Sequence, residues 1–192
     1  MPAPNIQPDL LFSFVGNPST AGVRRKIMEL QHPRAVVQDV RSNREDPSRS
    51  AMDADYWNLI ARSKFVLCPR GVGTGSYRVF ETLCAGRVPV IVSDDWQLPD
   101  GVDWGSCSIR IQSRDVAEIP RILEESEPMF DAMSAAARRS YDSHFATESL
   151  FDYVGDRLQS LVVSESRDGW SPWRQRRLVV DELKEAARRF NR

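Results

Sequence analysis

The stretch from Ser63 to Asp95 reads SKFVLCPRGVGTGSYRVFETLCAGRVPVIVSDD and contains a complete strand, loop, helix and strand. Two apolar runs in it, Lys64–Cys68 and Val88–Val92, have the length and composition of buried strands. A glycine-rich loop follows the first run, with Ser76 as the expected N-cap of a helix that ends at Gly86. Apolar strands joined through a helix are typical of a parallel sheet that is covered by helices on both faces.

The same alternation of apolar runs and helical patterns continues on both sides of this stretch. Strands are predicted at Leu10–Val15, Ala35–Val40 and Ser108–Ile111, and helices are predicted from Ser19 or Thr20, from Asp53, and over Asp115–Glu124, Pro128–His144 and Glu148–Val163. The polar segment Arg41–Ser50 predicts an exposed loop. Right-handed crossovers then favour an α/β fold, a Rossmann-like doubly wound parallel sheet of about five strands in the order 2-1-3-4-5.

Composition limits the classes of protein that this chain fits. It has 192 residues, 41% of them hydrophobic, with 26 Lys and Arg against 27 Asp and Glu. Such a balance argues against a nucleic-acid-binding protein, because no excess of cations meets the phosphates. We expect one Rossmann-like domain over residues 1–163. A tail over residues 164–192 is expected to carry an amphipathic helix with Val179, Leu183, Ala187 and Phe190 on one side.

The sequence gives only weak indications of where the protein is located and of what its cysteines do. No apolar run reaches the roughly 18 residues that a membrane span needs, and the N-terminus lacks a signal-peptide pattern. Localisation is therefore left open, with the cytoplasm as the default. Cys68, Cys84 and Cys107 lie in apolar segments and are expected to be reduced core thiols.

A ligand site is expected where the strand order reverses, between the first and the third strand. The loops that meet there are the turn at Gly16 and the glycine-rich loop from Pro69 to Ser76. Backbone N–H groups of such a loop, at the start of a helix, favour an anion. Arg70 and Arg78 flank the loop, and a guanidinium can hold phosphate oxygens through two hydrogen bonds. The pattern therefore indicates a diphosphate site.

Glu81 lies three residues after Arg78, so both side chains are expected on one helical face toward the loop. A carboxylate there can accept two hydrogen bonds from a ribose diol. The alternative is an empty loop with an ordinary surface ion pair between Arg78 and Glu81. The loop is neither a Walker loop, since no Gly-Lys-Ser/Thr follows, nor the G-x-G-x-x-G dinucleotide fingerprint.

Three motifs within this region point to a known family. They are Ser63-x-Phe65-x-Leu67-Cys68-Pro69-x-Gly71, Ser76-x-Arg78-x-x-Glu81 and Ala85-Gly86-x-x-Pro89-Val90-Ile91-x-Ser93-Asp94-Asp95. The chain resembles the exostosin-type glycosyltransferases in these motifs, and the resemblance extends over about residues 10–145. It implies the C-terminal, nucleotide-sugar-binding half of a GT-B enzyme, which transfers sugars with inversion and needs no metal ion as cofactor.

The resemblance also implies roles for individual residues. Glu81 would bind the ribose, and Arg78, Ser76 and Gly71 would surround the diphosphate. Arg24, in the first helix, would be a second cation for the phosphates.

The acidic pair Asp94 and Asp95 follows the fourth strand on the same rim. The two carboxylates either meet sugar hydroxyls or simply cap a turn. A divalent metal site is less favoured, because the chain offers no obvious third ligand. Trp96 and Trp104 bracket the loop after this strand, either as walls of a pocket or as core anchors.

No residue of the sequence can be assigned as the catalytic base. An inverting transfer needs a base to deprotonate the acceptor hydroxyl. His32 and His144 are expected to be capping or surface residues. The catalytic residues stay unknown, and a partner domain or chain is expected to supply the acceptor side.

Three hypotheses follow from these observations. The leading one is an exostosin-like glycosyltransferase, or its donor-binding half, that binds a UDP-sugar and serves transfer to a glycan or other hydroxyl acceptor. The second is a nucleotide-sugar-binding module without turnover of its own. The third is a structural or interaction domain whose loop binds nothing.

Overall fold

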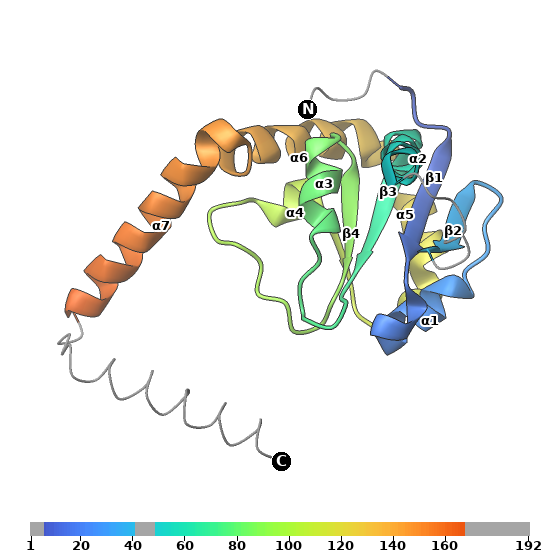
Figure 1. Ribbon diagram of the computed structural model, residues 1–192, viewed down its shortest axis with the longest axis horizontal. Helices are drawn as coiled ribbons and strands as arrows, with labels where there is room; N and C mark the ends of the chain where they lie inside the picture. Colours follow the sequence, from blue (N-terminus) through green and yellow to red (C-terminus); the bar gives the residue numbers. More distant parts are fainter. Residues whose placement is uncertain (1–5, 41–48, 168–192) are drawn as a thin grey trace, which may run out of the picture. The chain divides into compact units, whose positions relative to one another are not determined.

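The computed structural model describes residues 6–40 and 49–167, and its centre is a five-stranded sheet (Figure 1). All neighbouring strands run parallel, in the order β2-β1-β3-β4-β5. The predicted doubly wound topology is therefore confirmed. The strands are β1 (Leu10–Gly16), β2 (Ala35–Asp39), β3 (Ser63–Pro69), β4 (Val88–Val92) and β5 (Ile109–Ile111).

Helices cover both faces of the sheet (Figure 1). Alternate residues of β3 divide the core in two, because Phe65 and Leu67 pack in one cluster and Val66 and Cys68 in the other. The first cluster includes α1 and α5, the second α2, α3 and α4, and α6 contributes to both. The helices are η1 (Pro18–Thr20), α1 (Gly22–Met28), α2 (Arg49–Arg62), α3 (Arg78–Cys84), α4 (Trp104–Cys107), η3 (Val116–Glu118), α5 (Ile119–Ser126), η4 (Glu127–Met129), α6 (Phe130–His144) and α7 (Thr147–Arg167).

Several predicted helix starts are wrong by a few residues. Helix α1 begins at Gly22 with Ala21, rather than Ser19 or Thr20, at its N-cap position. Asn17 caps the preceding turn η1, because its side chain accepts a hydrogen bond from the Ser19 N–H at 2.9 Å. Helix α2 begins at Arg49, inside the segment predicted as a loop and before Asp53; residues 41–48 of that segment lie outside the described residues.

The start of α3 was predicted wrongly and its end correctly. Tyr77, not Ser76, occupies its N-cap position, and no side chain caps the helix there. Gly86 ends the helix as predicted, with a φ of 61° that glycine adopts without strain. The Arg87 N–H closes this turn on the Thr82 carbonyl at 3.0 Å. The short helix α4, in the connection between β4 and β5, has too few residues to give a periodic pattern.

The C-terminal part begins with α7, which continues past the predicted end at Val163 to Arg167. The chain divides into two compact units, Met1–Ser149 and Leu150–Arg192. The amphipathic helix expected at Val179 to Phe190 lies outside the described residues. In the part of the chain that the structure describes, no helix is both long and apolar enough to cross a membrane.

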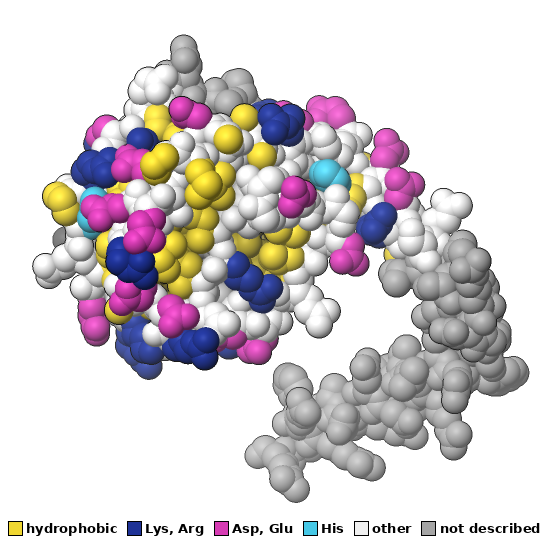
Figure 2. Space-filling model, turned by 180° about the vertical axis from the view of Figure 1, so that it is seen from behind, with side chains coloured by type: hydrophobic (Ala, Val, Ile, Leu, Met, Phe, Trp, Pro, Cys, Tyr) yellow, Lys and Arg dark blue, Asp and Glu magenta, His cyan; other side chains and the backbone are white. Residues whose placement is uncertain are grey.

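Surface charge and core thiols agree with the composition. On the face shown in Figure 2, basic and acidic side chains are interspersed and form no patch of a single sign. Cys68, Cys84 and Cys107 are free and buried, which confirms their predicted place in the core.

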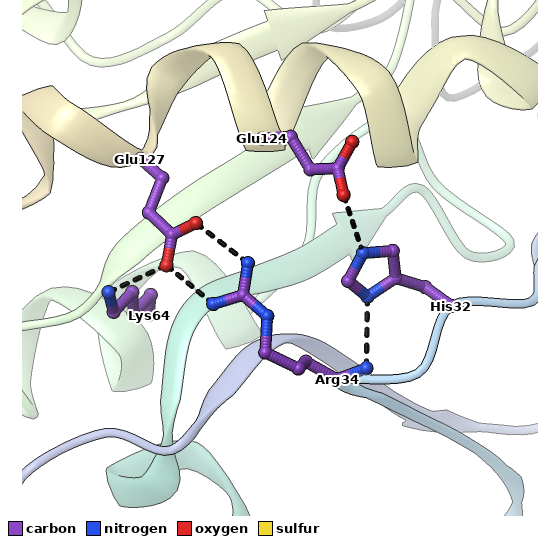
Figure 3. A network of polar contacts seen from close by, with 5 residues as sticks. All are labelled: His32, Arg34, Lys64, Glu124 and Glu127. Carbon is purple, nitrogen blue, oxygen red and sulfur yellow. Dashed lines mark hydrogen bonds and ion pairs between the residues drawn. The ribbon is translucent and has the colours of Figure 1, made fainter.

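Glu127 joins three segments at the edge of the sheet where the strands begin (Figure 3). Its carboxylate accepts hydrogen bonds from both Arg34 Nη atoms, at 2.6 and 2.8 Å, and from Lys64 Nζ at 2.7 Å. These two cations lower the pKa of Glu127 from its ordinary value near 4.5 to about 2. Beside it, the Arg34 N–H donates to His32 Nδ1, so His32 Nε2 donates to Glu124 at 3.0 Å.

Glu127→Gln is expected to lower the free energy of unfolding by about 1 to 2 kcal/mol at pH 7, because it removes a charged acceptor from two cations. A lowered pKa in the folded state stabilises the protein above the ordinary pKa. The difference from wild type should therefore be complete above about pH 4.5 and shrink as the pH falls toward 2. Urea denaturation at several pH values measures this.

The matched control is Glu125→Gln, which breaks an exposed pair with Arg121 and should cost less than about 0.5 kcal/mol. An equal cost for both variants, or a difference that does not depend on pH, would contradict the assignment.

Candidate functional site

A pocket of about 420 Å³ lies at the carboxyl edge of the sheet, where β1 and β3 end and α3 begins. This is the edge at which doubly wound proteins bind ligands. The residues that line it come from α1, α2, the loop after β3 and α3. They are Arg24, Tyr56, Gly71, Val72, Gly73, Gly75, Ser76, Tyr77, Arg78 and Glu81.

Arg78 is anchored at the strand ends. Its Nη2 donates to the Val15 carbonyl of β1, and its Nη1 donates to the Leu67 carbonyl of β3 at 3.5 Å. Its guanidinium also lies over the Phe14 ring, 5.0 Å from the centroid. With Nε donating to Tyr56, three of the five N–H groups have partners among the described residues, and the other two can still donate to a further acceptor.

Arg24 reaches the same pocket from α1. Its Nε donates to the Arg70 carbonyl at 2.9 Å and its Nη2 to the Pro69 carbonyl at 3.4 Å, so it ties α1 to the start of the glycine-rich loop. Burial and, secondly, the positive charge of Arg78 lower the pKa of Arg24, although a guanidinium stays charged at neutral pH. Two cations held beside one another form a site that an anion stabilises.

Glu81 is the carboxylate among the residues that line this pocket. Its Oε2 accepts a hydrogen bond from the Tyr56 hydroxyl at 2.5 Å. It makes no ion pair within 4 Å with the described cations, so the surface pair with Arg78 that the sequence left open does not form. A carboxylate at this place suits a ligand that presents hydroxyl groups.

The glycines of the loop make room for protein side chains. A Cβ at Gly71 would lie 3.3 Å from Arg24 Nη2, and one at Gly75 would lie 3.2 Å from the Trp96 ring. Only Gly73 of the three faces open space, with nothing within 4 Å. Gly71 and Gly75 therefore make room for Arg24 and Trp96, whereas Gly73 leaves the backbone open on its side.

Gly16→Ala is expected to destabilise the fold by about 1 to 3 kcal/mol, as in other overpacked sites. The added Cβ would lie 2.8 Å from the ring of Phe14, which is buried and packed against both arginines. Thermal denaturation measures the cost. Gly73→Ala, in the same region but with free space around it, is the control and should change stability by less than about 0.5 kcal/mol. Equal melting temperatures for both variants would refute the prediction.

The pocket brings together five of the residues singled out from the sequence: Arg24, Gly71, Ser76, Arg78 and Glu81. Gly16 ends β1 and lies beneath Arg24 rather than in the lining, since a Cβ there would be 3.3 Å from Arg24 Nη1.

Arg70 and the acidic pair lie outside the lining. Asp94 Oδ1 accepts a hydrogen bond from the Ser113 N–H at 2.8 Å, which lowers the pKa of Asp94; this partner lies after β5 and not in the loop that contains Asp94. Asp95 lies 4.0 Å from Arg70 Nη1. Arg70 Nε is buried and has no partner among the described residues.

Sequence reasoning missed three residues of the lining, namely Tyr56, Val72 and Tyr77. Val72 and Tyr77 are 87% and 88% exposed, which is unusual for such side chains. The available signal was their position, Val72 within the glycine-rich loop and Tyr77 directly after it. Tyr56 gave no signal, because it comes from α2, whose pattern indicates only a helix.

The remaining candidates lie outside this lining. Trp96 and Trp104 pack against the second core cluster, which agrees with the alternative that they anchor the core. His144 Nδ1 bonds the Ser140 carbonyl at 3.0 Å, and His32 belongs to the Glu124 contact. Within residues 6–40 and 49–167, no three His, Cys, Asp or Glu side chains cluster as ligands for a metal ion.

The chain matches a known protein family over most of its length. The family model described as the Exostosin GT47 domain matches residues 2–126, well over half of the chain. The chain belongs to the exostosin GT47 family. Its match therefore includes the whole glycine-rich loop and α3, with Arg78 and Glu81.

Relatives within the exostosin GT47 family are longer proteins. The Exostosin-1 homolog of Caenorhabditis elegans is 38% identical over 123 residues, which cover 62% of this chain and 32% of that protein. Exostosin-1 of Drosophila melanogaster is 36% identical over 139 residues, 67% of this chain and 18% of that protein. A protein of Arabidopsis thaliana named "Probable glucuronoxylan glucuronosyltransferase IRX7" is 31% identical over 140 residues, which cover 72% of this chain and 28% of that protein. The chain thus spans less than a third of the length of these curated relatives.

A solved structure supports the fold alone. The crystal structure of TarM superposes with a TM-score of 0.50 over 82% of this chain and 36% of that chain, at 10% sequence identity. An α/β architecture of this kind is therefore retained where almost no sequence identity remains.

Proposed function

We propose that this exostosin-family chain binds a UDP-sugar and serves its inverting transfer to a glycan or another hydroxyl acceptor. The observation that carries the proposal is the placement of Arg24, Arg78 and Glu81 on one pocket at the carboxyl edge of the sheet. Two guanidiniums suit a diphosphate, and a carboxylate suits the hydroxyls of a ribose. The choice of uracil rests on the family.

Arg24 and Arg78 would act on the donor by electrostatic stabilisation. When the bond between the sugar and the diphosphate breaks, negative charge grows on the departing diphosphate. Arg24 and Arg78 are held by backbone carbonyls before any ligand arrives, so little reorganisation is needed to stabilise that charge. We propose that these two cations do the work that a metal ion does elsewhere, so that transfer proceeds without a metal cofactor.

The acceptor hydroxyl needs a base of its own. Of the described residues that line the pocket, Glu81 is the sole carboxylate, and it is already assigned to the ribose. The base that deprotonates the acceptor is accordingly proposed to come from a partner domain or chain. This same observation favours a second candidate function, a donor-binding module without turnover of its own.

Calorimetry with UDP, UMP and ADP, with and without a chelator, tests the proposal. We expect UDP to bind at least about tenfold more tightly than UMP, because the second phosphate adds charge-assisted hydrogen bonds. The chelator should leave the affinity unchanged. A protein that binds none of the three nucleotides at millimolar concentration would refute the donor site. Release of free sugar from a UDP-sugar, or its transfer to an acceptor glycan, separates the enzyme from the binding module.

A further inference from the structure

Tyr56 lies between the two oppositely charged side chains of the candidate site. It belongs to α2, whereas Arg78 and Glu81 both belong to α3. The Tyr56 hydroxyl is 2.5 Å from Glu81 Oε2 and 3.2 Å from Arg78 Nε. The Arg78 guanidinium also lies over the Tyr56 ring, 5.8 Å from its centroid. One phenol thus contacts both halves of the proposed nucleotide site.

The directions of these two hydrogen bonds are fixed by chemistry. A guanidinium only donates, so the Tyr56 oxygen accepts from Arg78. The single hydroxyl proton is then donated to Glu81, which accepts it as a carboxylate. Burial raises the pKa of Tyr56 well above its usual value, so the phenol keeps this proton at all physiological pH values.

The phenol also changes what Arg78 and Glu81 do to each other. Opposite charges three residues apart on a helix commonly pair directly. Here the described part of the structure has no Arg78–Glu81 ion pair within 4 Å, and the Tyr56 hydroxyl bridges the two groups. Glu81 Oε1 receives no hydrogen bond from the described residues, so one carboxylate oxygen is left for a ligand.

We propose that Tyr56 is a positioning residue that keeps Arg78 and Glu81 apart, with the guanidinium set for phosphate and Glu81 Oε1 set for a ribose hydroxyl. This inference rests on the proposed function of the pocket as a nucleotide site. Without the hydroxyl, Arg78 and Glu81 would close on each other, and the carboxylate would lose its fixed orientation. Tyr56 thereby couples affinity for the diphosphate to recognition of the ribose.

The experiment compares the affinities of Tyr56→Phe and wild type for UDP and for 2′-deoxy-UDP. We expect the affinity for UDP to fall about tenfold, roughly the value of one hydrogen bond to a charged group. The preference of wild type for UDP over 2′-deoxy-UDP should shrink toward unity, a change that a general loss of stability does not produce. The double variant Tyr56→Phe with Glu81→Gln should bind no more weakly than Glu81→Gln alone.

Tyr141→Phe is the matched control, since it removes another half-buried phenol hydroxyl, on α6 and outside the pocket lining. It should keep both affinities. Should Tyr56→Phe not fold, Glu81→Asp withdraws the carboxylate from the phenol by one methylene and should cause the same loss of preference. Failure of wild type to bind UDP overturns the proposed function. Binding by wild type, with an unchanged preference in Tyr56→Phe, overturns the role of Tyr56 alone.

Discussion

Arg78→Ala is expected to lower the affinity for UDP about 100-fold, equivalent to about 2.7 kcal/mol, the loss of two charge-assisted hydrogen bonds. The two N–H groups of Arg78 not used inside the protein are the ones proposed to meet the diphosphate. Arg78→Lys keeps the charge but loses the planar fork, so its affinity should fall to an intermediate value. Calorimetry with UDP measures all three proteins.

Two controls separate binding from folding in this experiment. Arg121→Ala removes an exposed arginine of α5 that pairs with Glu118 and Glu125, and its affinity for UDP should equal that of wild type. Circular dichroism should show that Arg78→Ala is folded, although the Val15 and Leu67 carbonyls lose a donor. Equal UDP affinity of Arg78→Ala and wild type would remove Arg78 from the site.

Phe65→Ala is expected to lower the free energy of unfolding by about 3 to 5 kcal/mol, the usual cost of truncating a buried aromatic side chain. Phe65 lies in the central strand β3, is fully buried, and packs edge-on against Phe130 with 6.0 Å between ring centroids. A domain with 5 to 15 kcal/mol of stability has little left after such a loss. Urea denaturation gives the difference.

The comparison for this variant is Phe151→Ala, in the second compact unit. Phe151 is 79% exposed, so its truncation removes little buried surface and should cost less than about 0.5 kcal/mol. A cost below about 1 kcal/mol for Phe65→Ala would contradict the position of β3 at the centre of the core.

The five strands were predictable because each carries its own signal. Val88–Val92 is apolar at every position and is buried at every position, as a strand between two helical layers must be. The order 2-1-3-4-5 followed from right-handed crossovers and needed no knowledge of side-chain contacts. Helix starts were less predictable, since Asn17 and Ser19 are both good caps and the choice between them depends on how the chain leaves β1.

The candidate site was only partly predictable. Arg78 and Glu81 share a short helix after a glycine-rich loop, so local sequence was enough to place them together. Asp94 follows β4 on the same edge, yet its carboxylate turns to the Ser113 N–H, a partner 19 residues away. Adjacency in the sequence brings residues to one edge of a sheet but does not decide which way a side chain points.

The sequence by itself determined the sheet, the loop after β3 and the charged pair on α3, because strand and helix periodicity and glycine positions are local properties. Only the tertiary structure decided that Tyr56 separates Arg78 from Glu81 and that Arg78 is anchored on Val15, 63 residues away. Hydrogen bonds of this kind form only after distant segments have packed, and no pattern along the chain encodes their direction.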